Sequence, residues 1–159
     1  MKYCPLCKAE LLAQVHEGKS RLSCSSYDCD YVFWNSPTPV VLAIVNYQGQ
    51  YVITNNAAWP EWKYSLISGF VDANEDSQKA IEREVYEELR LESTSTTLIT
   101  VSLFERLNQL MISYYVEAQG ELILNSENRA FKLLNEEEII HWSFGLGATP
   151  AVQKWFVEK

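Results

Sequence analysis

The sequence has no cluster of lysine and arginine and no long apolar run, and both absences restrict its function. Its 159 residues include 13 Lys and Arg against 21 Asp and Glu, a formal net charge of −8 at pH 7. Such a surface repels nucleic acid unless a local basic patch offsets it, so we expect no nucleic-acid partner. No apolar run approaches the roughly 18 residues of a membrane span, so we expect no membrane partner either.

The sequence also lacks an internal repeat, a low-complexity segment and an apolar signal region at its start. Because a secretory signal needs such an apolar region, we expect a cytoplasmic location. The composition is 47% hydrophobic and 13% aromatic. That is enough for a sizeable core and is far from a disordered composition. The length fits one ordinary domain with a small appendage.

Cysteine is confined to the first 30 residues. Cys4 and Cys7 form a Cys-x-x-Cys pair, and Cys24 and Cys29 form a wider pair after a spacing suited to a short hairpin. In a reducing compartment four such cysteines indicate metal before disulfide. The pattern therefore predicts a closed, tetrahedral, structural zinc site of four cysteines, that is, a zinc ribbon.

Three alternatives to the zinc ribbon stay open from the sequence. Two disulfides would require a secreted protein, a metal-free remnant would keep the cysteines without the ion, and His16 could replace one cysteine as a ligand. So small a segment cannot fold by core burial alone, so zinc would supply much of its folding free energy. We predict a ribbon over residues 1–36 and a second domain over 37–159, because Pro37 and Pro39 make a stiff, extended connection.

Residues 69–91 carry the most informative pattern. A glycine-bearing loop, Gly69 to Asn74, leads to a helix that we expect to begin near Asp76 or Ser77, with Asp76 a suitable N-cap. No proline interrupts the run up to Leu91. An apolar stripe for the core recurs every four residues of this helix, at Ile81, Val85 and Leu89.

Three carboxylates share a helix face beside that stripe. Glu84 and Glu88 lie four residues apart, and Glu87 is one position away. Like charges at this spacing destabilise a helix by roughly 0.2–0.5 kcal/mol per pair, which Arg83 offsets in part through Glu87. A divalent cation would offset far more, because Mg²⁺ binds carboxylate oxygens together with substrate phosphates. The alternative is a solvated acidic face.

The whole stretch resembles the Nudix box, the signature of the Nudix hydrolases. The positions that match at the family's spacing are Gly69, Glu75, Arg83, Glu84, Val85, Glu87, Glu88 and Leu91. Arg90 departs from the pattern, because the family has there a glycine that ends the helix in a left-handed conformation. A non-glycine residue in that conformation costs on the order of 1 kcal/mol.

The resemblance implies a fold and a reaction. The fold is an α/β sandwich with a mixed central sheet between helices. The reaction is hydrolysis, dependent on Mg²⁺ or Mn²⁺, of the diphosphate in a nucleoside diphosphate linked to a group X, giving a nucleoside monophosphate and phospho-X. A zinc ribbon ahead of a Nudix domain resembles the NADH pyrophosphatase and ADP-ribose pyrophosphatase branch, so ADP-ribose, NAD(H) and FAD are the expected substrate types. The alternative is a non-catalytic, nucleotide-sensing or regulatory module.

The resemblance also implies roles for the box residues. Glu84, Glu87 and Glu88 would be the catalytic metal ligands, with Arg83 holding the carboxylates in place. Glu75 would pair structurally with Arg83.

Two further metal ligands are implied outside the helix. The backbone carbonyl of Ser68 would be one, with Gly69 allowing the backbone to approach the metal closely. Glu127 is the nearest candidate for an additional glutamate, because Arg129 stands where the NADH branch has one. The family likeness is also compatible with a homodimer.

Four side chains are candidates for contacts with the nucleotide. Phe104 would stack on a base and Arg106 would contact phosphate or ribose; the alternatives are a core aromatic and a surface ion pair. A Ser-Gln-Pro-Trp motif of the NADH branch is absent around them, which argues against strict NADH specificity. Trp59 and Trp62 either pack as core or lid or stack on a base.

The remaining pattern predicts the other elements. A turn is expected at Gln48-Gly49 and a hairpin at Gly120. A short helix with an acidic start should follow Asn135, and a glycine-containing loop over 144–147 should lead to a last helix with Thr149 as its N-cap. Strands are expected over residues 40–46, 51–54, 66–71, 98–104, 110–118, 121–124 and 130–134.

Overall fold

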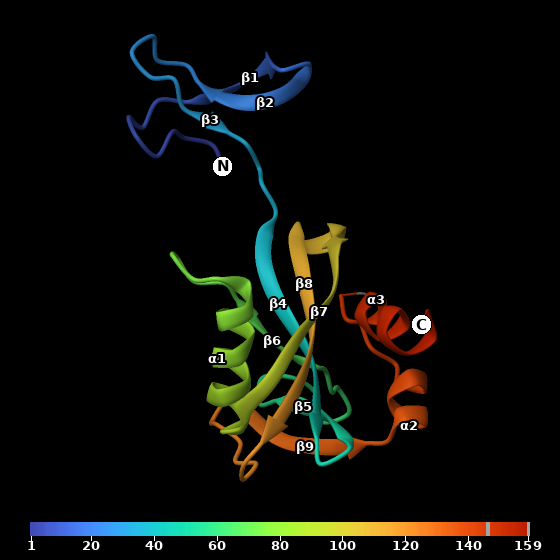
Figure 1. Ribbon diagram of the computed structural model, residues 1–159. Coiled ribbons are helices and arrows are strands. Elements are labelled where there is room, and N and C mark those ends of the chain that lie inside the picture. Colours follow the sequence, from blue (N-terminus) through green and yellow to red (C-terminus); the bar gives the residue numbers. More distant parts are fainter. Residues whose placement is uncertain (146, 159) are drawn as a thin grey trace. The chain divides into compact units, whose positions relative to one another are not determined.

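A computed structural model describes residues 1–145 and 147–158 of the chain. Leu146, in the predicted glycine-containing loop, and Lys159, at the end of the second predicted domain, lie outside the described residues. The chain forms two compact units, Met1–Ser36 and Pro37–Lys159 (Figure 1).

The first unit is a small three-stranded antiparallel sheet in the order β1-β2-β3. The strands are β1 (Leu11–His16), β2 (Lys19–Cys24) and β3 (Val32–Phe33). A tight turn at Glu17-Gly18, with φ angles of 51° and 78°, joins β1 to β2. The buried cluster of this unit consists of Cys4, Leu11 and Cys24, which is too little apolar surface to stabilise a fold without another interaction.

The second unit is built on a mixed sheet with the strand order β7-β8-β4-β5-β9. β4 is central: it is parallel to β8, and both β5 and β6 pair antiparallel with it. The strands are β4 (Thr38–Tyr47), β5 (Gln50–Asn56), β6 (Ile67–Phe70), β7 (Glu92–Phe104), β8 (Gln109–Gln119) and β9 (Asn128–Leu134).

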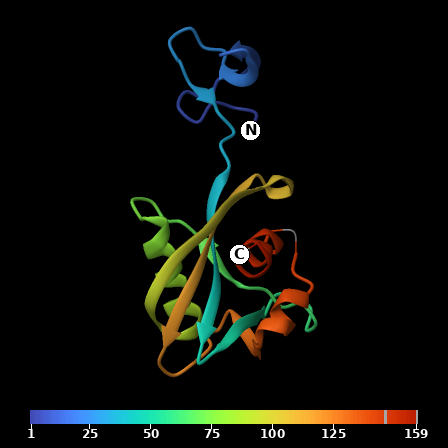
Figure 2. The same cartoon turned by 45° about the vertical axis from the view of Figure 1, so that its right-hand side comes forward.

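Helices cover both faces of this sheet, as Figures 1 and 2 show. α1 (Ser77–Leu89) lies on one face, and α2 (Glu136–His141) and α3 (Thr149–Val152) lie on the other. The side chains of β4 alternate between the two cores, with Val41 packed toward α1 and Leu42 toward α2 and α3. Burial on both faces explains why β4 is a continuous apolar run. The predicted α/β sandwich with a mixed sheet is confirmed.

Most predicted elements are present, but the strand predicted over 121–124 is wrong. This segment has no strand pairing, although Leu122 and Leu124 pack against the α1 core. Its backbone instead bonds the end of α1: Ile123 N–H donates to the Leu89 carbonyl (2.9 Å) and Asn125 N–H to the Glu88 carbonyl (3.2 Å). The last carbonyls of a helix lack partners within it, so this segment satisfies them.

The last turns of the chain also differ from the prediction. Ala148 is the N-cap of α3, and the Thr149 hydroxyl donates to the Phe144 carbonyl (3.4 Å) instead of accepting from a helix N–H. α3 continues into a π-helical turn, η2 (Gln153–Val157). No helix within residues 1–145 and 147–158 is long and apolar enough to cross a membrane.

The exit of α1 keeps the geometry that a glycine would give. α1 ends at Leu89, and Arg90, at the position of the family's helix-ending glycine, is left-handed with φ of 58°. The Arg90 N–H donates to the Tyr86 carbonyl at 2.9 Å, and the Arg90 guanidinium lies over the Tyr86 ring, 5.2 Å from its centroid. The helix therefore ends correctly, with the strain of a Cβ in the left-handed region.

Replacing Arg90 with glycine is expected to raise the free energy of unfolding by about 0.5–1 kcal/mol, because glycine adopts this conformation without the Cβ clash. Urea unfolding of the purified protein measures the change. Arg90→Ala is the matched control: it keeps the strain and removes the contact with the Tyr86 ring, so it should be neutral or destabilising. A glycine variant no more stable than the alanine variant would contradict the prediction.

Candidate active site

The site forms where β6 meets α1. Gly69, in β6, lies directly against the carboxylate of Glu84, and a Cβ at position 69 would overlap that carboxylate. A larger residue at position 69 would therefore force the Glu84 side chain to move away from the strand. The box glycine thus admits the Glu84 carboxylate to this position.

Arg83 is the hub of the acidic face. Its guanidinium donates to both carboxylate oxygens of Glu75 (2.8 and 3.0 Å), to Glu84 Oε1 (2.7 Å) and to Glu87 Oε2 (3.3 Å). It also donates to the Phe70 carbonyl (3.1 Å) and so fastens the loop to the helix. The Arg83 hydrogen bond, helped by a backbone N–H, lowers the pKa of Glu75 to about 2.

Glu88 is the most buried carboxylate of the face, 9% exposed. Burial raises its pKa to about 7, and the charges of Glu84 and Glu127 add to the shift. Hydrogen bonds from Asn128 and the Ser68 backbone oppose it; Asn128 Nδ2 donates to Glu88 Oε2 at 2.7 Å. The structure therefore brings Ser68, Glu127 and Glu88 together.

Glu84 shares this environment. Burial raises its pKa, the Arg83 hydrogen bond lowers it, and the charges of Glu87 and Glu127 raise it again. Glu87 is the more open member, with its side chain 52% exposed. The pKa values of Glu84 and Glu88 are thus raised mainly because both carboxylates are buried, and the charges of neighbouring carboxylates add a smaller contribution.

These residues fit Mg²⁺ or Mn²⁺ by donor type, since carboxylate and carbonyl oxygens suit hard cations. A bound divalent cation would offset the cost of keeping the Glu84 and Glu88 carboxylates charged in this buried position. The carboxylates are not gathered into a preformed cage among the described residues, because Arg83 holds Glu84 and Glu87. Metal binding would therefore redistribute these hydrogen bonds.

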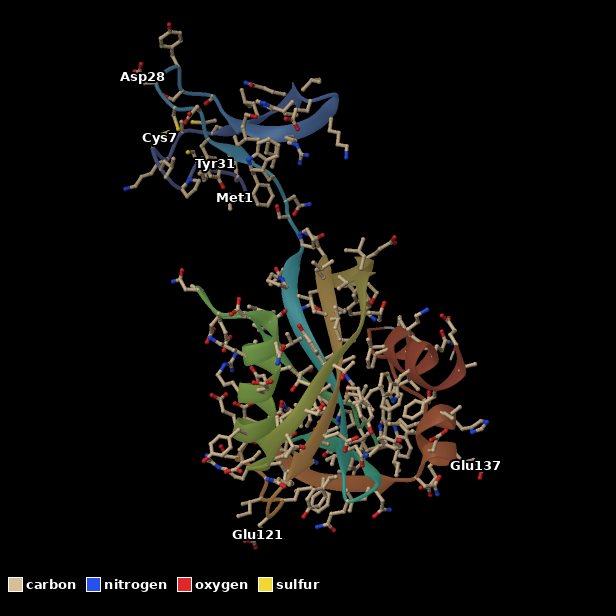
Figure 3. All side chains as sticks on the ribbon, in the orientation of Figure 1. Met1, Cys7, Asp28, Tyr31, Glu121 and Glu137 are labelled. Carbon is tan, nitrogen blue, oxygen red and sulfur yellow. The ribbon has the colours of Figure 1, made fainter. Side chains whose placement is uncertain are left out.

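The four cysteines form a separate and tighter group. Their Sγ atoms all lie within 4.8 Å of one another, with 3.7 Å between Cys4 and Cys29 and 3.3 Å between Cys7 and Cys24. A tetrahedral zinc with bonds of about 2.3 Å separates its sulfurs by roughly 3.8 Å, so the group fits zinc. None of the four is paired in a disulfide, and His16 lies outside the group, with Nε2 2.5 Å from Ser23 Oγ. In Figure 3 the sulfurs lie beside the labelled Cys7.

A cavity of about 1050 Å³ opens beside the carboxylate face. Ser68 and Gly69 line it and also belong to that face, while Val40 and Leu42 of β4 form part of its apolar lining. The lining also includes the four candidates for contact with the nucleotide, which are Trp59, Trp62, Phe104 and Arg106. Lys63, His141 and Trp142 line the same cavity. None of its described lining residues is Asp or Glu.

Two side chains that hold parts of the candidate site were not identified from the sequence. Asn128 orients Glu88 from 40 positions away, and no local pattern marks it. Arg129 stands where the NADH branch has a glutamate. It donates to the carbonyls of Ala57 and Trp59, the latter at 3.0 Å. Arg129 therefore holds the loop that carries Trp59 and does not contribute a ligand to the candidate metal site. The acidic turn of α2 is separate: Glu137 points into solvent in Figure 3.

The box geometry agrees with a family match. The model of the NUDIX domain matches residues 35–153. The chain belongs to the Nudix family. This confirms the resemblance and the expected class of enzyme, a pyrophosphohydrolase.

Solved structures share the fold of this Nudix protein. A Nudix hydrolase from Nitrosomonas europaea superposes with a TM-score of 0.78 at 21% identity, covering 98% of this chain and 92% of that one. The MutT protein from Methanosarcina mazei Go1 gives 0.60 at 17% identity, covering 74% and 92%.

A curated relative matches over a short segment. The NAD-capped RNA hydrolase NudC of Mycobacterium tuberculosis, strain ATCC 25618 / H37Rv, is 45% identical over 40 residues, which is 25% of this chain. The same figures hold for NudC of Mycobacterium bovis, strain BCG / Pasteur 1173P2. The match spans 13% of the length of these relatives.

Proposed function

We propose that this Nudix protein hydrolyses the diphosphate of a nucleoside diphosphate linked to X, with Mg²⁺ or Mn²⁺, giving a nucleoside monophosphate and phospho-X. The observation that carries the proposal is the shared wall: Ser68 and Gly69 lie at the carboxylate face and also line the 1050 Å³ cavity. A substrate with its diphosphate at the carboxylates would therefore place one of its ends in the cavity.

The residues of the carboxylate face would have different roles in this hydrolysis. Glu84, Glu87, Glu88 and the Ser68 carbonyl would hold the cations, with Glu127 as a further ligand or base. A bound cation supplies neutralisation of the phosphate charge and a more acidic water. A water oxygen bonds to one phosphorus, the anhydride P–O bond breaks, and the released proton passes to a carboxylate or to solvent. Arg83 and Asn128 hold the carboxylates in position.

Substrates of the NAD(H), ADP-ribose or FAD type are the first to test. The NudC match supports a NAD-type diphosphate, because that relative is named an NAD-capped RNA hydrolase. The net charge of −8 gives no support for binding the RNA body itself. We therefore place the free nucleotide ahead of a capped RNA.

Turnover of a substrate panel tests the proposal. The panel contains ADP-ribose, NADH, NAD⁺, FAD, a NAD-capped oligoribonucleotide and nucleoside triphosphates, each with Mg²⁺ and with Mn²⁺. Chromatography should show AMP and phospho-X in equal amounts from a dinucleotide. Binding of a nucleotide without turnover of any member would overturn the enzyme proposal in favour of a sensor.

Replacing Asn128 with alanine is expected to lower kcat/KM by about 10- to 100-fold, the usual cost of losing a side chain that orients a metal ligand. The Mg²⁺ concentration for half-maximal rate should rise, because Glu88 loses its fixed position. Steady-state kinetics at varied Mg²⁺ measures both. Asn135→Ala is the control, since Asn135 caps α2 and lies outside the site. Equal effects of the two variants would contradict the role of Asn128.

A further inference from the structure

The loop over residues 57–63 is held rigidly although it is mostly exposed. Asn55, which is 1% exposed, donates from Nδ2 to the carbonyls of Pro60 (2.9 Å) and Lys63 (2.6 Å). From the other side, Arg129 donates to the carbonyls of Ala57 and Trp59. A buried amide and a guanidinium thus fix one short loop.

This loop presents aromatic side chains to the cavity. Trp59 and Trp62 both line it, and Trp62 is 79% exposed. The Lys63 ammonium lies over the Trp59 ring, 4.2 Å from its centroid. An exposed tryptophan on a loop whose backbone is held in place offers a ring face on which a planar base stacks, whichever base it is.

His141 adds a hydrogen-bonding group of fixed type to the same cavity. Its Nδ1 lies 2.8 Å from the Glu137 carbonyl oxygen. A carbonyl oxygen only accepts, so Nδ1 carries the proton and Nε2 of the neutral ring is an acceptor. Through its remaining nitrogen, His141 therefore offers a ligand a site for an N–H or O–H donor.

We propose that this cavity takes the nucleobase end of the substrate, and that the base is an amino-bearing one such as adenine. The base stacks on Trp62, and its amino group donates to Nε2 of His141. Group X then lies on the other side of the carboxylate face. The inference rests on the proposed function for the position of the diphosphate, whereas the base contacts are measurable without hydrolysis.

Two monophosphates test the base contacts. AMP and purine riboside 5′-monophosphate differ only in the amino group, and neither contains a diphosphate to be cleaved. Calorimetric titration should show AMP binding about tenfold more tightly, the worth of one well-placed hydrogen bond. His141→Ala should remove that difference by weakening AMP alone. Trp62→Ala should weaken both ligands about tenfold or more, because stacking does not depend on the amino group.

Matched controls separate these effects from general damage. Trp34→Ala removes another exposed tryptophan and His16→Ala the other histidine, both in the first unit, and neither should change binding. Equal affinity of the two monophosphates in the unaltered protein would overturn the amino-group contact. Unchanged binding in Trp62→Ala would overturn the stacking. AMP selectivity without turnover of the substrate panel would overturn the enzyme proposal and leave this inference standing.

Discussion

Replacing Glu88 with glutamine is expected to abolish hydrolysis and at the same time to stabilise the protein when no divalent cation is added. A metal ligand at the diphosphate contributes several kcal/mol of transition-state stabilisation, so kcat/KM should fall on the order of 10³-fold. Glutamine keeps an oxygen that can accept from Asn128 but removes the charge. Steady-state kinetics on the best substrate of the panel measures the loss.

The stability change follows from the raised pKa of Glu88, about 7 against an ordinary value of 4.5. Between these values the folded protein keeps a proton that the unfolded chain has released. The free energy of unfolding of the unaltered protein therefore falls as the pH rises through this window. That of the variant does not, because it has no carboxyl group at position 88. At pH 8 the variant should be more stable by on the order of 2 kcal/mol, and near pH 4 the difference should vanish.

Urea unfolding at several pH values, in buffer without added divalent cation, measures the stability difference. Glu82→Gln is the matched control: it is on the same helix, but it bonds Gln78 and Thr96 instead of the site, and its activity should be unchanged. A Glu88→Gln protein that keeps more than about a tenth of the activity would contradict the assignment, as the expected loss is far larger.

Removing zinc is expected to unfold the first unit, Met1–Ser36, and to leave the second unit folded. Binding of structural zinc contributes about 10–16 kcal/mol of apparent folding free energy in comparable small folds. This unit has only a small buried cluster of Cys4, Leu11 and Cys24 to stabilise it otherwise. Cys24→Ser should act like chelation. Amide resonances of the first unit should collapse to unfolded positions, while those of the second unit stay dispersed.

Metal analysis supplies the control for this experiment. The unaltered protein should contain one zinc per chain, and His16→Ala should contain the same amount, because His16 bonds Ser23 and lies outside the cysteine group. A first unit that remains folded without any metal would show the ribbon to be a metal-free remnant and would contradict the prediction.

The sequence predicted the elements whose cause is local. The apolar stripe of α1, the box spacing and the continuous apolar run of β4 each follow from residues near one another in the chain. The error at 121–124 has the same origin: its apolar residues fit a strand, but their partners are the core beside α1 and the helix-end carbonyls. No local pattern distinguishes these two ways of burying leucine.

The supports of the site could not be predicted, because they act over long separations. Asn128 reaches Glu88 across 40 positions and Arg129 reaches Ala57 across 72. The pairing of β9 with β5 brings Arg129 close to Ala57, whereas Glu88 meets Asn128 from α1. From the sequence, Phe104 and Trp62 are candidates for contact with a base. That they line one cavity follows only from the way in which β4, β6 and the loop over residues 57–63 come together.

Three consecutive residues, Glu127 just before β9 and the first two residues of β9, serve three different parts of the molecule. Glu127 contributes its charge to the carboxylate face, Asn128 orients Glu88, and Arg129 holds the loop over residues 57–63. A substitution, insertion or deletion here would alter catalysis and substrate choice together. Evolution toward a new substrate should therefore leave this tripeptide alone and proceed through Trp62 and His141, which can change one at a time. A mutational library would show the tripeptide as intolerant and those two positions as permissive.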